Sequence, residues 1–323
     1  MAEPVAAVAI GRNEGDRLTR CLASLSDQGL SPVVYVDSGS TDGSVEAARR
    51  LGAEVVELDL AVPFTAARAR NAGAARVAEV APDTAYIQFV DGDCELAKGW
   101  ISAALETFSG SERLAVVCGR RRERFPEASL WNRMIDAEWD TPVGEAEACG
   151  GDALIRRAAL DAVDGYREDL IAGEEPEMCL RMRGAGWRIC RIDAEMTLHD
   201  AAMTRIGQWW QRARRAGHAY AEGAALHGST PRRYKVTETR RALLWGAGLP
   251  LAGLLGALFV SPWLLLLPVL GWAAQVVRLS VISGEKPVRA LFLTLGKLPE
   301  AQGVLGYWAG RLTGRRRGLI EYK

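Results

Sequence analysis

The sequence predicts an α/β fold with a doubly wound sheet, followed by a hydrophobic pair of helices. Two observations indicate the sheet: short apolar runs alternate with helical patterns through the first part of the chain, and several of these runs end on an aspartate or a glycine. The third observation is that residues 242–277 contain no charged side chain, a run of 36 residues. One membrane-spanning helix needs roughly 20 residues, so this run is long enough for two.

The composition is that of a folded protein whose charge is unevenly distributed. Of its 323 residues, 49% are hydrophobic and 25% charged, which excludes disorder over most of the length. From residue 201 onward 18 Lys and Arg face 5 Asp and Glu, whereas residues 1–200 carry 22 against 35. The formal net charge of zero is therefore the sum of an acidic segment, residues 1–200, and a basic segment from residue 201 onward.

The cysteines and the N-terminus both favour a cytosolic environment. The six cysteines form no CxxC pair and show no spacing typical of a metal site, which favours reduced thiols. The stretch MAEPVAAVAIGRNEG lacks the basic region and the apolar run of a signal peptide. We therefore expect a strand to begin almost at once.

Strands and helices are expected in alternation up to residue 91. The expected strands are VAAVAI (5–10), PVVYVD (32–37), AEVVELDL (53–60) and TAYIQFVD (84–91), and the helices between them are LTRCLASL, SVEAARRLG and ARARNAGAARVA. Ligands of such sheets bind beyond the carboxyl ends of the strands. Asp37, Asp91 and the turn GRNE are therefore expected at one edge. Residues 112–200 are less regular, with a further strand at 114–119 (LAVVCG).

Two aspartates follow the last of the early strands, in the stretch QFVDGDCE. Gly92 allows a tight turn, so Asp91 and Asp93 repel each other unless protons, basic side chains or a divalent cation neutralise them. A calcium loop is not indicated, because the residues that follow Asp93 depart from its pattern of acidic ligands. A plain polar turn is the alternative to a cation site.

Five motifs in order resemble the inverting glycosyltransferase family 2, whose GT-A fold binds nucleotide sugars in a mixed, Rossmann-like sheet. The resemblance covers about residues 5–220. Its motifs are VAIGRNEGDRL, VYVDSGSTDGS, ARARNAGAA, FVDGDCE and the segment from GGDALIRRAAL to EEPEMCLRMRGAGW. A single one of these motifs is weak, but their order makes coincidence improbable.

The resemblance implies a site for the nucleotide at the carboxyl edge. Asp37 is expected to bind the base or ribose, with Arg12 and Glu14 lining the same pocket. Arg70 is expected to contact the base or the diphosphate. As alternatives, Glu14 caps a helix N-terminus and Arg70 is a solvated helix residue.

The resemblance also implies a metal ion and a catalytic base. Asp93 is expected to bind Mg²⁺ or Mn²⁺, with Asp91 reaching the ribose or a metal-bound water, and His199 completing the metal site or serving structure. The family usually has GED, whereas this chain has Gly173-Glu174-Glu175, so Glu175 is expected as the base, with Glu174 as the second candidate. Acidic residues that merely favour a helix N-terminus are the alternative.

Beyond residue 200 the chain resembles processive family members imperfectly. The stretch IGQWWQRARRAGHAY has Gln208 and Arg212 of a QxxRW element, but no Trp follows Arg212. This departure favours transfer of a single sugar. Arg212 is expected to contact a diphosphate, together with Arg214 and Arg215.

The C-terminal third is expected to associate with a membrane. We predict a catalytic domain at 1–230, a helical hairpin at 231–285 broken near Ser261-Pro262, and a basic amphipathic segment at 286–323. Basic residues flank both ends of the hairpin, which places both ends in the cytoplasm. A buried pair of core helices is the alternative, and the hairpin either spans or re-enters. Arg311 and Arg315–Arg317 are expected at lipid phosphates, or in a solvated tail.

These features predict a membrane-attached inverting glycosyltransferase. The expected donor is a nucleoside-diphosphate sugar, with UDP as the expected nucleotide. The expected acceptor is a lipid-linked (polyprenyl-diphosphate) saccharide at the cytoplasmic face, in exopolysaccharide or envelope glycan synthesis. No nucleic-acid partner is expected. The alternatives are an inactive, membrane-anchored scaffold that binds nucleotide sugars, and a nucleotidyltransferase, although the turn GRNEGDR lacks the lysine of a phosphate loop. Retention of configuration is a further alternative.

Overall fold

The structure is a computed structural model that describes residues 4–314. The chain forms two compact units, residues 1–204 and 205–323. The predicted catalytic domain ends later, at residue 230, so the helix at 206–227 falls in the second unit. Arg315–Arg317 lie outside the described residues.

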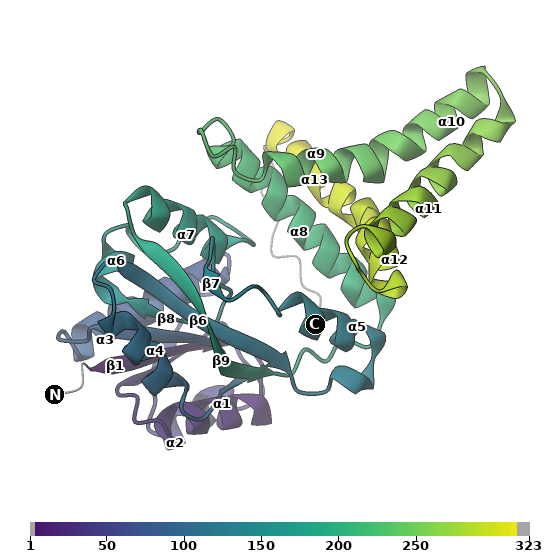
Figure 1. Ribbon diagram of the computed structural model, residues 1–323. Coiled ribbons are helices and arrows are strands. Elements are labelled where there is room, and N and C mark those ends of the chain that lie inside the picture. Colours follow the sequence, from purple (N-terminus) through teal and green to yellow (C-terminus); the bar gives the residue numbers. More distant parts are fainter. Residues whose placement is uncertain (1–3, 315–323) are drawn as a thin grey trace. The chain divides into compact units, whose positions relative to one another are not determined.

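The first unit is built on a nine-stranded mixed sheet in the order β3-β2-β1-β4-β8-β6-β9-β5, with β7 beside β9 (Figure 1). Strands β3, β2, β1 and β4 are parallel, whereas β8 is antiparallel to both β4 and β6. The strands are β1 Val5–Gly11, β2 Val33–Asp37, β3 Glu54–Glu57, β4 Tyr86–Asp91, β5 Cys94–Leu96, β6 Leu114–Glu123, β7 Gly144–Glu145, β8 Ala153–Arg156 and β9 Arg188–His199. The predicted α/β class and the mixed sheet are therefore confirmed.

Seven α-helices accompany this sheet in the described part of the unit. They are α1 Asp16–Ser26, α2 Ser44–Arg50, α3 Ala66–Val80, α4 Trp100–Ser109, α5 Leu130–Glu138, α6 Arg157–Asp161 and α7 Glu174–Gly184. Helix α3 lies very close to β1, because a Cβ at Gly73 would stand 2.3 Å from Val8. This close approach brings Arg70 on α3 to the carboxyl ends of the central strands.

One strand extends well past its predicted end. We predicted a strand at 114–119, but β6 continues to Glu123 and pairs in parallel with β9. The extension consists of Arg120, Arg121, Arg122 and Glu123, and such a run of charges reads as a loop in sequence. Cross-strand pairing with β9 holds it extended, because Glu123 lies opposite His199 in the register.

The second unit is helical and ends in an apolar hairpin. Its helices are α8 Ile206–His227, α9 Val236–Leu243, α10 Leu249–Phe259, α11 Leu266–Val281, α12 Pro287–Leu295 and α13 Lys297–Leu312, with a π-helical turn η2 at Leu244–Gly248 and a 3₁₀ turn η3 at Pro262–Leu265. Helices α8 and α13 pack backbone to backbone, because a Cβ at Gly303 would stand 2.0 Å from the carbonyl oxygen of Arg214.

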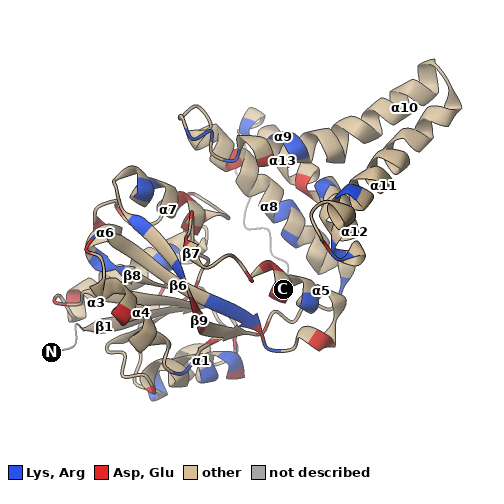
Figure 2. Ribbon diagram, in the orientation of Figure 1, with Lys and Arg blue, Asp and Glu red and all other residues tan. Residues whose placement is uncertain are grey.

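The uncharged run forms two helices, as predicted, and the chain turns at Ser261-Pro262. Two segments, Val236–Phe259 and Pro262–Val281, are candidate membrane spans by length and composition. In an apolar 18-residue stretch of each segment, 11% and 0% of the residues are buried. Leu258, Phe259 and Trp263 are more than two-thirds exposed. Figure 2 shows no charge along α10. This exposure argues against the alternative of a buried core pair.

Candidate active site

The turn after β4 is held tightly against β1. The backbone N–H of Gly92 donates to the carbonyl oxygen of Ile10 at 2.8 Å, and a Cβ at Gly92 would stand 3.1 Å from that oxygen. The parallel register pairs Ile10 with Asp91. Because a side chain at position 92 would press on this backbone, glycine lets both aspartates leave the strand at the edge of the sheet.

Asp91 lies between two arginines. Its Oδ1 accepts from Nη2 of Arg70 at 2.9 Å, and its Oδ2 accepts from Nη2 of Arg121 at 3.2 Å. Its backbone N–H donates to Oδ1 of Asp152 at 3.0 Å, while Nε of Arg121 lies 3.4 Å from Oδ2 of Asp152. The charge of Asp91 is therefore largely compensated by arginine, and its oxygens are already engaged.

Arg70 joins the turn Asp91-Gly92-Asp93, called the aspartate turn below, to helix α7. Its Nη1 lies 3.0 Å from Oε1 of Glu174 and 3.0 Å from Oε1 of Glu175. The Arg70 side chain is only 3% exposed. Burial alone would lower the pKa of Arg70, but Glu175, Asp91 and Glu174 raise it well above its usual value. Arg70 is therefore a permanent positive charge among three carboxylates, not a solvated helix residue.

Glu175 is the more accessible of the two glutamates. Its side chain is 14% exposed, against 4% for Glu174. Burial, and then repulsion from Glu174, raise the pKa of Glu175 to about 7, while Arg70 acts in the opposite sense. A carboxylate with a pKa near the working pH suits a general base.

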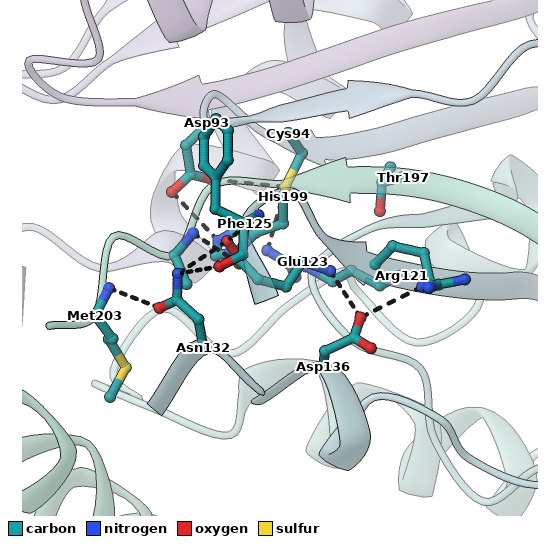
Figure 3. A network of polar contacts seen from close by, with 12 residues as sticks. Asp93, Cys94, Arg121, Glu123, Phe125, Asn132, Asp136, Thr197, His199 and Met203 are labelled. Carbon is teal, nitrogen blue, oxygen red and sulfur yellow. Dashed lines mark hydrogen bonds and ion pairs between the residues drawn. The ribbon is translucent and has the colours of Figure 1, made fainter. Parts of the chain in front are cut away.

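Asp93 and His199 form a second cluster, drawn in Figure 3. Nε2 of His199 lies 3.4 Å from Oδ2 of Asp93, and both side chains are buried. Burial, and then the charge of Arg121, lower the pKa of His199, so the imidazole is neutral and can bind a metal. Adjacent ligands of an octahedral Mg²⁺ stand about 3 Å apart, so these two atoms fit a shared cation.

Cys94 is a poor ligand for such a cation. Its sulfur lies within 4.8 Å of ligand atoms of Asp93 and His199, in a group that could hold a metal. Burial, however, raises the pKa of the Cys94 thiol well above its usual value. A protonated thiol binds metals weakly, and Mg²⁺ and Mn²⁺ prefer oxygen and imidazole donors.

The predicted nucleotide residues lie at the same edge, but Asp37 is engaged in its own turn. Its Oδ1 accepts from the hydroxyl of Tyr35 at 2.8 Å, and its Oδ2 accepts from the backbone N–H groups of Gly39 and Ser40 at 2.8 Å. Arg12 is exposed, and Glu14 forms an ion pair with Arg17 at 2.8 Å. Their roles in nucleotide binding stay predictions.

Arg212 belongs to α8 in the second unit, so its predicted contact with a diphosphate also stays a prediction.

Sequence reasoning missed three residues of these clusters: Arg121, Asp152 and Glu123. Arg121 and Glu123 lie in the unexpected end of β6, and Glu123 faces Nδ1 of His199 at 3.5 Å. Asp152, within GGDAL, has a fully buried side chain and accepts from Oγ1 of Thr197 at 2.7 Å. An acidic residue directly before an apolar strand was the available signal for Asp152.

Comparison with known proteins agrees with the fold and the motifs. Residues 8–163 match the model of glycosyl transferase family 2. The succinoglycan biosynthesis protein ExoA of Rhizobium meliloti is 26% identical over 301 residues, which are 88% of this chain and 87% of ExoA. Glycosyltransferase AglE of Haloferax volcanii is 23% identical over 201 residues, 58% of this chain and 64% of AglE.

A solved structure shares the fold over nearly the whole chain. The mannosyltransferase PcManGT from Pyrobaculum calidifontis, in complex with GDP-Man and Mn²⁺, superposes with a TM-score of 0.59 at 18% identity, covering 98% of this chain and 89% of PcManGT. The match over residues 8–163 relates the N-terminal unit to glycosyl transferase family 2, and the fold shared with PcManGT agrees with the predicted GT-A fold.

Proposed function

We propose that the protein is a membrane-attached inverting glycosyltransferase. It moves a sugar from a nucleoside-diphosphate sugar, with UDP as the preferred nucleotide, to a lipid-linked saccharide at the cytoplasmic face. The observation that carries this proposal is Arg70, which joins Asp91 of the aspartate turn to Glu174 and Glu175 of α7. One buried cation thereby connects the candidate donor side to the candidate base.

Donor binding is assigned to the sheet edge. Asp93 and His199 would hold Mg²⁺ or Mn²⁺, which supplies positive charge against the charge that develops on the leaving diphosphate. Arg121, 14% exposed and stacked 4.8 Å from the Trp139 ring, keeps Asp91 oriented from the other side. The predicted reach of Asp91 to the ribose or a metal-bound water is part of this proposal.

The chemical step is assigned to Glu175. A carboxylate oxygen of Glu175 removes the proton from the acceptor hydroxyl as the hydroxyl oxygen attacks the anomeric carbon. The bond from that carbon to the diphosphate oxygen breaks on the opposite face, so configuration inverts. Glu174, more deeply buried, stays with Arg70 and keeps the pKa of Glu175 raised.

The acceptor assignment depends on the second unit. Its candidate spans expose large apolar side chains, which would bring the enzyme to a bilayer where a polyprenyl-linked sugar is found. The succinoglycan name of the relative ExoA supports an exopolysaccharide or envelope pathway. Arg311, in the last turn of α13, is placed at lipid phosphates in this proposal.

The test measures sugar-nucleotide turnover by the full chain in detergent, with UDP- and GDP-sugars. We expect turnover that a chelator abolishes and Mn²⁺ restores, and an Asp93→Asn variant whose Mn²⁺ requirement rises about 10- to 100-fold, since a metal ligand is weakened. Asp83→Asn, on the turn before β4, is the matched control and should behave as wild type. Turnover that is indifferent to chelation would refute the metal-dependent assignment.

The raised pKa of Glu175 predicts the pH profile. The base works only when ionised, so kcat/KM should rise with pH through about 7 and level off above it. The Glu174→Gln variant removes the repulsion that raises this pKa, so the midpoint should move to lower pH. The measurement is kcat/KM between pH 5 and 9, and a midpoint that stays in place would show that Glu174 does not act on the base.

A further inference from the structure

Three neighbouring strands deliver a row of side chains to the candidate metal site. The register of β5 with β9 pairs Cys94 with His199, which places Asp93 beside the imidazole. The register of β6 with β9 pairs His199 with Glu123 on its other side. The imidazole therefore lies between two carboxylates, 3.4 Å from Asp93 through Nε2 and 3.5 Å from Glu123 through Nδ1.

Glu123 is itself held rigidly. Its Oε1 accepts from the backbone N–H of Phe125 at 3.1 Å and from Nδ2 of Asn132 at 3.2 Å. Its Oε2, the oxygen that faces His199, accepts from the backbone N–H of Ala201 at 2.9 Å. The side chain is completely buried, so three donors fix the position of this carboxylate, and Nδ1 of the imidazole lies 3.5 Å from it (Figure 3).

The imidazole is restrained from other directions too. The carbonyl oxygen of His199 accepts from the backbone N–H of Arg124 at 2.7 Å, and the Trp139 ring packs edge-on against the imidazole at 4.9 Å. When a cation lies between Asp93 and Nε2, Glu123 is the remaining carboxylate that can accept the ring proton, so the proton is then on Nδ1. That tautomer leaves the lone pair of Nε2 directed toward Asp93 and a cation.

We propose that Glu123 is the positioning residue of the metal site, because it holds His199 with Nδ1 protonated and Nε2 ready to bind Mg²⁺ or Mn²⁺ next to Asp93. This inference rests on the proposed function, since it presupposes that Asp93 and His199 bind the cation. Metal-binding histidines commonly donate their second N–H to a carboxylate, and loss of that carboxylate costs about 10- to 100-fold in metal affinity.

The decisive substitution is Glu123→Gln, which retains shape but places an amide N–H₂ or a weaker acceptor toward Nδ1. An N–H₂ at that position favours the opposite tautomer, whose Nε2 carries a proton and cannot bind a metal. We expect the Mn²⁺ affinity of the full chain in detergent to fall about 10- to 100-fold. The measurement is the free Mn²⁺ signal in electron paramagnetic resonance, with Mn²⁺ alone and with UDP or GDP added.

Coupling separates positioning from simple structural support. In a His199→Gln background, Glu123→Gln should cause no further loss of Mn²⁺ affinity, because Glu123 acts through the imidazole. Glu177→Gln replaces another buried glutamate, ion-paired with Arg181 on α7, and should leave Mn²⁺ affinity unchanged. An equal loss from Glu123→Gln in both backgrounds would overturn the proposal.

A measurement on the wild type covers the case of a variant that fails to fold. The chain has only three histidines, so ¹⁵N spectra of histidine-labelled protein are simple, and His199→Gln identifies the resonance. With Mg²⁺ added, we expect the Nδ1–H tautomer at His199, and the Nε2–H tautomer would refute the inference. Wild type that binds no Mn²⁺ with any nucleotide would instead refute the metal-dependent function itself, whereas wild-type affinity retained in Glu123→Gln would refute the inference alone.

Discussion

Replacing Glu175 with glutamine should reduce kcat by about 10³- to 10⁴-fold, because the amide cannot take the proton of the acceptor hydroxyl. Glutamine nearly preserves the volume of the side chain and can still contact Arg70 through its oxygen. Binding of the donor should therefore change little, since the candidate metal residues Asp93 and His199 are untouched. The measurement is kcat with a lipid-linked acceptor beside the Kd of the nucleotide.

Matched variants at the same two positions identify the base. Glu175→Asp supplies the residue that the family usually has and should keep a substantial part of the activity, whereas Glu174→Gln should keep the base and shift its pKa downward. The opposite pattern, in which Glu174→Gln abolishes turnover and Glu175→Gln does not, would assign the base to Glu174. Hydrolysis of the donor without acceptor is a different reaction, so the assay that decides is transfer to the lipid-linked acceptor.

The fold could be predicted as far as local pattern extends. The four early strands, two of which end on an aspartate, were predicted as segments of six to eight residues, and the structure confirms them with ends shifted by a few residues. The order β4-β8-β6-β9 could not be predicted, because strand pairing is long-range and leaves no local pattern. The break at Ser261-Pro262 was predictable because proline acts locally.

Site residues at the ends of predicted strands or helices could be predicted from the sequence. Charged residues that reach the site only because two distant strands pair could not be predicted. Asp91 is the last residue of a buried strand, Asp93 follows two residues later, and Glu174 and Glu175 begin a helix. Arg121 and Glu123 lie in a run of four charged residues that only β9 holds as strand. The side chain of Asp152 is buried by Thr197 and Arg121, which are distant in sequence. Residues whose roles arise from such contacts need the folded chain.

Arg70 should be the most sensitive single position for the stability of the first unit. Replacing it with methionine leaves Asp91, Glu174 and Glu175 close together without their shared cation. Loss of one partner from a buried ion cluster costs about 3–5 kcal/mol in free energy of unfolding. Activity should be lost as well, because the same residue positions both the aspartate turn and the candidate base.

The stability loss in Arg70→Met should depend on pH in a defined direction. Without the guanidinium, the pKa of Glu175, which is already raised to about 7 in the wild type, rises further, because Arg70 acts to lower it. A raised pKa contributes stability at pH values below the unfolded value, near 4.5, and that contribution is lost as pH rises through the folded value. Because the pKa of Glu175 in the wild type is already about 7, the difference from wild type should be smallest below about pH 7 and should increase as pH rises above it.

Hydrogen exchange of the β1 and β4 amides measures this effect, because it reports the unfolding free energy of the first unit separately from the helical unit. Arg76→Met is the control, since Arg76 lies on the same helix but its ion pairs with Glu54 and Glu79 are on the surface, and it should exchange like wild type. Adding Glu174→Gln and Glu175→Gln to Arg70→Met should restore most of the stability, because the uncompensated charges are then removed, while turnover stays absent. If the triple variant were no more stable than Arg70→Met, the loss would come from the packing of the arginine side chain against Tyr166 and not from the three carboxylates.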